Sequence, residues 1–347
     1  MGSSELRETA PGEGVHAGEA FFRKRFWRGI VCTLVGAALW GFSGACAQFL
    51  LSNYAITPAF ITSARMLGAG LLFLIVLWAT QREKLFSMLR DKRTMGRLAV
   101  FGGVGLYLCQ ITYAIVIGYT NAGTATVLQC TGIAFVLLFT CVFLRRLPRV
   151  RETVGLVAAM GSTWIIATQG DVGTLALPLS GLVWGIANGL SVAFYIMFPK
   201  SLFAEWGSFA VTGLGMLVGG IAATAVWLSG ILDGQAGALP VMDAAGWSVL
   251  AVIAVVGTFA AFALYLHGVS VIGSVKGSLL GAIEPVSATV FAALWLGTAF
   301  TGADWIGFAL MIAMIFLVTG EKPSMPDDAA ASKSDGEDHV GKMASES

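Results

Sequence analysis

Apolar runs follow one another along this chain from Gly29 to Thr319, and the polar stretches between them are too short to fold independently. A helix needs about 17 to 25 mostly apolar residues to cross the hydrocarbon core of a bilayer, because every backbone polar group must find its partner within the segment. Ten runs meet this requirement. We predict them at 29–50, 58–80, 98–118, 122–144, 153–169, 179–198, 208–230, 247–268, 277–296 and 303–319.

The composition agrees with a membrane location. Of the 347 residues, 56% are hydrophobic and 12% are charged, whereas a soluble domain carries about 25% charged residues. We therefore predict an all-α integral membrane protein with ten transmembrane helices and two polar tails. The tails are 1–28 and 320–347, and the second is charged, lacks aromatic residues and is expected to be disordered.

The basic residues predict the orientation, since lysines and arginines beside a span are retained in the cytoplasm. With ten spans, the basic loops 23–28, 82–97 and 145–151 fall on one side together with Lys200 and Lys276. The opposite loops contain no basic residue and carry four aspartates, Asp171, Asp233, Asp243 and Asp304. We therefore expect both termini to be cytoplasmic in a cell membrane. Nine or eleven spans would scatter the basic loops over both sides.

The chain also matches itself. Shifting it by 152 residues aligns 99–167 with 251–319 without a gap. Because each half has an odd number of spans, the halves would insert with opposite orientation, as in many secondary transporters. This predicts two inverted five-helix repeats, at 29–169 and 179–319. Matching pairs include Gly105/Gly257, Tyr113/Tyr265, Leu128/Leu280, Phe139/Phe291 and Gly155/Gly307.

Several short motifs occur in order along these spans. They are ALWG at Ala38–Gly41, WG at Trp184–Gly185, the stretch Pro58–Arg65 and SLLGAIEPVSATV at Ser278–Val290. In this series the chain resembles the drug/metabolite transporter superfamily, specifically proteins with two EamA domains. The resemblance implies a carrier of a small organic metabolite, such as an amino acid, that is often moved outward.

The two halves differ at one point that bears on chemistry. Gly132-Ile133 stands in the fourth span where the ninth has Glu284-Pro285. An ionisable residue inside a span is costly and normally faces a cavity or a partner. Pro285 removes a backbone hydrogen bond and can free a carbonyl one turn earlier. We expect both residues to contact the solute; the alternative is that Glu284 bonds a neighbouring helix and fixes packing.

Arg65 lies about seven residues into the second span. Its guanidinium offers a planar fork of donors that suits a carboxylate or a phosphate in the solute. The alternative is an anchor that reaches outward to the membrane surface.

Aromatic and amide side chains recur at helical spacing in the third and eighth spans and complete the candidate solute site. Packing and interhelical hydrogen bonds are the alternatives for these residues. The set is Tyr107, Gln110, Tyr113, Phe262 and Tyr265, with Gln129, Asn188, Trp40 and Trp184.

The residues favour a secondary transporter over other classes. The chain has no GxxxxGK[ST] motif, so ATP is not expected to drive transport directly. It has no HExxH, and its five cysteines lack CxxC spacing or a nearby histidine, so we expect no enzyme activity, cofactor or metal. The expected partners are a small solute and the lipid bilayer, not nucleic acid. A channel or a membrane scaffold remains the alternative.

Overall fold

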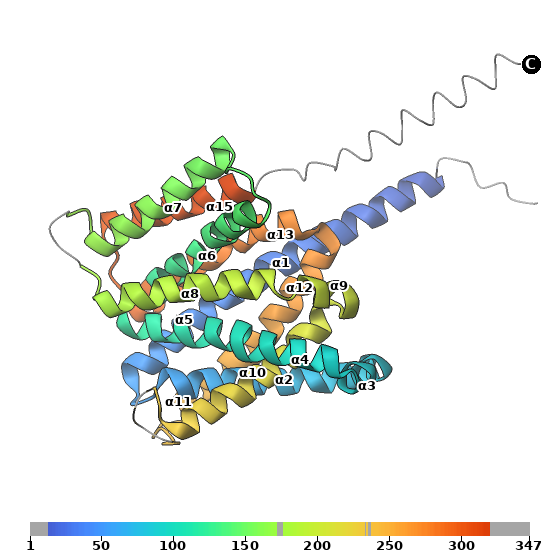
Figure 1. Ribbon diagram of the computed structural model, residues 1–347, viewed down its shortest axis with the longest axis horizontal. Helices are drawn as coiled ribbons and strands as arrows, with labels where there is room; N and C mark the ends of the chain where they lie inside the picture. Colours follow the sequence, from blue (N-terminus) through green and yellow to red (C-terminus); the bar gives the residue numbers. More distant parts are fainter. Residues whose placement is uncertain (1–12, 172–175, 233, 235–236, 320–347) are drawn as a thin grey trace, which may run out of the picture.

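A computed structural model describes residues 13–171, 176–232, 234 and 237–319 (Figure 1). The predicted disordered tail 320–347 and Asp233 lie outside these residues. The described part of the first half is helical, and a π-helical segment, η1 (Phe101–Leu106), joins two of its helices. The α-helices are α1 Glu13–Asn53, α2 Pro58–Thr80, α3 Arg82–Arg90, α4 Lys92–Val100, α5 Tyr107–Tyr119, α6 Ala122–Phe143 and α7 Val150–Thr168.

The second half repeats this pattern. A second π-helical segment, η2 (Val255–Ala260), again lies within the third long helical run of its half. A short helix, α9, lies where the first half has no counterpart. The α-helices are α8 Leu179–Met197, α9 Lys200–Trp206, α10 Ser208–Ser229, α11 Ala244–Ala254, α12 Ala261–Ile272, α13 Ser274–Gly281, α14 Ile283–Leu296 and α15 Gly302–Thr319.

Each of the ten predicted ranges overlaps one helix or helical segments in series. In the described residues, eight helical runs are long and apolar enough to cross a membrane by length and composition. The fifth range, α7, is not among them, because its first turn contains Arg151 and Glu152 and the helix also contains several small or polar residues. The tenth, α15, is a shorter apolar helix.

Local sequence explains where several helices begin. Asn121 accepts a hydrogen bond from the backbone N–H of Thr124 and caps α6, and Asp243 caps α11 in the same way through Gly246. Such caps satisfy backbone donors that the helix leaves free. The ninth run divides at Ala282, between α13 and α14, because Pro285 has no N–H for the carbonyl one turn earlier. The fourth run, α6, has no proline and is continuous.

Glu152 caps α7. Its carboxylate accepts the backbone N–H of Arg149 at 2.6 Å and binds both terminal guanidinium nitrogens of Arg146 at 2.7 Å. The hydrogen bonds from Arg146 are the largest cause that lowers the pKa of Glu152 from 4.5 to about 2. A lowered pKa stabilises the fold at pH values above the unfolded pKa, and this contribution disappears as the pH falls through the folded pKa.

We therefore expect Glu152→Gln to lower the thermal midpoint at pH 7, by an amount that shrinks as the pH falls from 4.5 towards about 2. Thermal unfolding of detergent-purified protein over a pH series measures this. Glu83→Gln, an exposed carboxylate on α3, is the matched control and should show a much smaller difference. A Glu152→Gln deficit that stays constant over this range would contradict the ion-pair explanation.

Helices α2 and α10 cross at close range through reciprocal contacts. A Cβ atom on Gly70 would lie 2.7 Å from the Cα of Leu217, and one on Gly220 would lie 2.8 Å from the backbone nitrogen of Leu67. Gly220 lies 150 positions after Gly70, and Leu217 lies 150 positions after Leu67, so the two contacts are made by corresponding residues of the two halves. Small residues allow such contact between helix backbones in a membrane.

The same reciprocity holds where α7 and α15 lie side by side at one edge of the bundle (Figure 1). A Cβ on Gly155 would lie 2.7 Å from Val318, and one on Gly307 would lie 2.5 Å from Ile166. Each residue of one pair lies 152 positions from its counterpart in the other. Reciprocal pairs of this kind are expected where two similar units meet about a two-fold axis.

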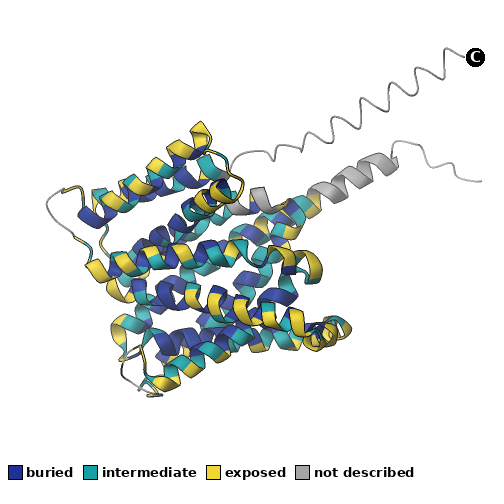
Figure 2. Ribbon diagram, viewed as in Figure 1, coloured by how far each residue is buried: buried dark blue, intermediate teal, exposed yellow. Residues whose placement is uncertain are grey.

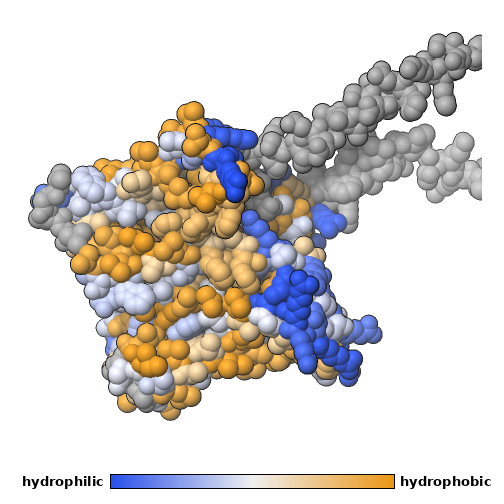
Figure 3. All heavy atoms as spheres, in the orientation of Figure 1, coloured by the Kyte–Doolittle hydropathy of each residue, from blue (hydrophilic) through white to orange (hydrophobic). Residues whose placement is uncertain are grey.

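Burial and polarity of the side chains depend on their position in the bundle. Buried residues line the faces where helices meet, and exposed ones lie on outer faces (Figure 2). Hydrophilic side chains gather at the end of the bundle that holds α3 (Figure 3). We call this the basic end, because α3 and the first turn of α4 supply Arg82, Lys84, Arg90, Lys92 and Arg93 there.

Candidate functional site

Glu284 and Gln129 meet in the interior of the bundle. Gln129 on α6 donates its side-chain N–H to Oε1 of Glu284 on α14 at 3.1 Å. Both side chains are half-buried, although helices surround them. This bond is the interhelical contact that stands as the alternative to solute binding. It joins α6 of the first half to α14 of the second half. The carboxylate is thus held in place by a hydrogen bond between α6 and α14.

Aromatic rings lie beside this pair. Trp40 on α1 contacts Phe262 and Tyr265 on α12, with ring centroids 4.7 and 4.5 Å apart. Tyr113 on α5 and Tyr265 both lie close enough to Glu284 to interact with it electrostatically. Tyr107 is buried in the same apolar cluster as Phe262. The rings supply the apolar surface that small-molecule sites usually have.

Arg65 turns inward from α2 and is 4% exposed. Its Nε donates to Oγ1 of Thr258 in η2 at 3.2 Å, and one terminal nitrogen donates to Oγ of Ser43 in α1 at 3.3 Å. A side chain held in this way does not reach the membrane surface, so the outward anchor is not what the structure shows. Within the described residues Arg65 forms no salt bridge, yet its charge acts on Glu284.

Two glycines of α1 let the other helices approach. A Cβ on Gly41 would lie 2.0 Å from Oγ of Ser287 and 2.5 Å from the carbonyl oxygen of Glu284. A Cβ on Gly44 would lie 2.4 Å from the hydroxyl of Tyr113. Glycine at these positions therefore brings α14 and α5 against α1. We call Trp40, Arg65, Tyr113, Gln129, Phe262, Tyr265 and Glu284 the central cluster.

Some polar groups of the candidate site residues have no partner. The indole N–H of Trp40 and the side-chain oxygen of Asn188 are buried and have no hydrogen-bond partner in the described part of the chain. The Asn188 amide nitrogen bonds Thr112 at 2.8 Å and the Cys109 carbonyl at 2.9 Å, both on α5. Gln110 is 8% exposed, and no side-chain hydrogen bond forms from it among the described residues. Buried polar groups are normally satisfied, so the unpaired Trp40 and Asn188 atoms are candidates to bond a polar solute.

The structure places Trp184 elsewhere. It lines an open pocket of about 490 Å³ at the end of the bundle opposite the basic end. The ends of α1 and α5 and the beginning of α2 form the other walls, through residues that include Leu51, Pro58 and Tyr119. Trp184 therefore lies at the mouth of the bundle, whereas its counterpart Trp40 lies in the interior.

Sequence reasoning missed Ser43 and Thr258, which hold Arg65. Serine and threonine are common in membrane helices and bond most often to their own backbone, so their residue type gives no signal. Their positions relative to a buried arginine could have been suspected only from a correct packing of α1 and η2 against α2.

Comparison with known proteins decides the family. The sequence profile of the EamA-like transporter family matches residues 27–168 and again 179–320. This chain belongs to the EamA-like transporter family. It is a multi-pass membrane protein with two EamA repeats.

The relatives of this EamA-like protein are named as transporters. It is 31% identical to the uncharacterized inner membrane transporter YicL of Salmonella typhimurium, over 84% of this chain and 95% of the relative. It is 20% identical to the uncharacterized transporter YwfM of Bacillus subtilis, over 82% and 92%. A solved crystal structure shares the fold, with a TM-score of 0.58 and 18% identity over 84% of this chain and 96% of the other.

Proposed function

We propose that this EamA-like protein is a secondary transporter that moves a small organic solute by alternating access between its two repeats. One observation carries the proposal. The bond between Gln129 and Glu284 places an ionisable group where the first repeat meets the second. In transporters built from repeats, solute sites lie at this kind of interface, near the middle of the membrane.

Ten crossings in two inverted halves are part of the proposal. Support comes from the reciprocal contacts of α2 with α10 and of α7 with α15. Helix α7 has 19 residues and α15 has 18, so each extends about 27 to 29 Å, close to the thickness of the hydrocarbon core. Because α7 and α15 pack against each other, one face of each helix is covered by protein.

We place the basic end, and with it both termini, in the cytoplasm. The gathering of lysines and arginines at the end that holds α3 supports this orientation, because such residues are retained on the cytoplasmic side. The open pocket at the opposite end then faces outward.

The central cluster favours an amino-acid-like solute. Arg65 can bind a carboxylate through the donors that Ser43 and Thr258 leave free, and Glu284 can bind an ammonium group. Trp40 and Tyr265 supply an apolar wall. The resemblance to metabolite transporters favours export as the direction of net transport.

A thermal-shift screen of purified protein against amino acids, nucleobases and vitamins tests the solute class. We expect amino acids to stabilise the wild type, by about 2.7 kcal/mol at a concentration 100 times the Kd. Arg65→Lys should lose most of this shift because lysine lacks the planar fork. Arg93→Lys, an exposed position on α4, is the control. No shift from any carboxylate-bearing solute, or an equal shift in Arg65→Lys, would count against the proposed solute.

A further inference from the structure

The two repeats differ in the connection between their first and second long helices. In the first repeat, α1 ends at Asn53 and α2 begins at Pro58, so four residues join them. In the second repeat, α8 ends at Met197 and α10 begins at Ser208, and helix α9 occupies the longer connection. The short connection borders the open pocket at one end of the bundle, whereas α9 lies at the basic end.

Helix α9 packs inward. Leu202 is fully buried in the large apolar cluster of the bundle, and Phe203 and Trp206 pack against that cluster. The ring of Phe203 lies edge-on to that of Phe101 in η1, with centroids 5.9 Å apart. Three of its seven residues thus cover the core at the basic end.

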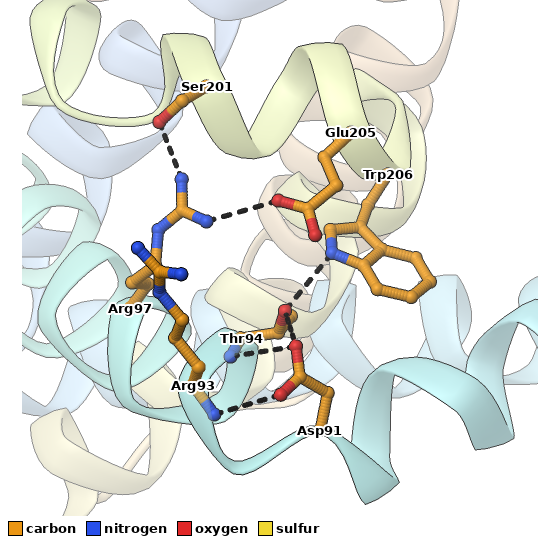
Figure 4. A network of polar contacts seen from close by, with 7 residues as sticks. All are labelled: Asp91, Arg93, Thr94, Arg97, Ser201, Glu205 and Trp206. Carbon is orange, nitrogen blue, oxygen red and sulfur yellow. Dashed lines mark hydrogen bonds and ion pairs between the residues drawn. The ribbon is translucent and has the colours of Figure 1, made fainter.

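Polar contacts hold the outer side of α9 to α4 (Figure 4). One terminal guanidinium nitrogen of Arg97 lies 3.1 Å from a carboxylate oxygen of Glu205, and the other donates to Oγ of Ser201 at 2.5 Å. Arg97 belongs to the first repeat, whereas Glu205 and Ser201 belong to the second. The contacts therefore join the two repeats directly.

A second contact supports the first. The indole N–H of Trp206 donates to Oγ1 of Thr94 at 3.1 Å, and the Thr94 hydroxyl donates to Asp91 at 2.5 Å (Figure 4). The Thr94 hydroxyl is the largest cause that lowers the pKa of Asp91, so this carboxylate stays charged and keeps the threonine oriented. Thr94 is 1% exposed.

We infer that α9 is a gate that closes the path from the central cluster to the basic end. Its latch is the contact of Arg97 with Glu205 and Ser201. The inference rests on the proposed function and adds the element that must move. In the structure this end is covered by α9 while the opposite end holds an open pocket, as expected for one of the two states of a carrier.

The latch is weak enough to be reversible. The side chains of Arg97 and Glu205 are 27% and 48% exposed, and exposed ion pairs contribute little to stability. Breaking the pair should therefore raise the fraction of molecules open at the basic end by about two- to five-fold, without unfolding the protein.

Cross-linking tests the gate. In a background without native cysteines, Arg97→Cys and Ser201→Cys would be joined by a short bifunctional thiol reagent that reductant cleaves. We expect solute exchange to stop on cross-linking and to return on reduction. The pair Arg90→Cys and Arg93→Cys, both in the first repeat, is the matched control and should keep exchanging. Exchange that continues through the cross-linked protein overturns the inference.

Sided labelling tests the latch without any solute. Cys130 lies near Glu284 and is half-buried, so it reports access to the central cluster. With Cys130 as the sole cysteine, Glu205→Gln should raise its labelling by an impermeant maleimide from the basic end by about two- to five-fold. Glu83→Gln is the control. Unchanged labelling overturns the latch, whereas a wild type that exchanges no solute overturns the proposed function and leaves this measurement valid.

Discussion

Replacing Gly41 by alanine should abolish solute exchange and destabilise the protein more than the other substitutions considered. The added Cβ would lie 2.0 Å from Oγ of Ser287 and 2.5 Å from the carbonyl oxygen of Glu284. Backbone cannot move aside as a flexible side chain can, so α1 and α14 must separate. Overpacking of this kind costs about 1 to 3 kcal/mol or more. Separation of α1 from α14 would also move Trp40 on α1 away from Glu284 on α14.

Two measurements on Gly41→Ala distinguish these effects, namely the thermal midpoint in detergent and the initial rate of exchange in proteoliposomes. Gly96→Ala is the matched control, because nothing lies within 4 Å of a Cβ added at Gly96. Alanine is favoured over glycine in an exposed helix by about 0.5 to 1 kcal/mol, so Gly96→Ala should be as stable as the wild type or slightly more stable. Equal behaviour of the two variants would contradict the close packing of α1 on α14.

Glu284→Gln should lower the rate of solute exchange by at least about ten-fold, which corresponds to about 1.4 kcal/mol. Glutamine has the size of glutamate and can still bond Gln129, so the packing of α14 against α6 is retained. It lacks the charge that would bind an ammonium group or take up a proton inside the membrane. The loss should therefore appear in exchange and in ligand-induced stabilisation, with little change in the thermal midpoint of the free protein.

The matched control is Glu83→Gln, which removes an exposed carboxylate from α3. Both variants would be reconstituted at equal density, with insertion checked by protease protection. Exchange at the wild-type rate by correctly inserted Glu284→Gln would show that the carboxylate only fixes packing.

The long helices could be predicted from sequence, because each must satisfy its own backbone and therefore shows as an apolar run. The closeness of Trp40 to Tyr265 was not available in this way, since it depends on how α1 crosses α12. Arg65 shows the same limit. Its residue type indicated a special role, yet only the positions of Ser43 and Thr258 decide that it turns inward.

Helix α9 was missed for a different reason. The predicted spans end at 198 and resume at 208, so the sequence predicts a loop between them. Seven residues are too few for a clear helical period, and Leu202 is the one fully buried position among them. Arg97 and Glu205 are separated by 108 positions in the sequence and belong to different repeats. A local sequence pattern cannot predict a contact between residues so far apart in the chain.

Counterflow distinguishes a carrier that alternates access from a channel. Proteoliposomes loaded with an excess of an unlabelled solute identified by thermal shift would be diluted into a trace of the same solute in labelled form. A carrier that alternates access around the central cluster predicts transient accumulation of label above its equilibrium level, driven by exchange, and loss of that overshoot in Glu284→Gln. Simple equilibration of label without an overshoot, as through a channel, would contradict alternating access.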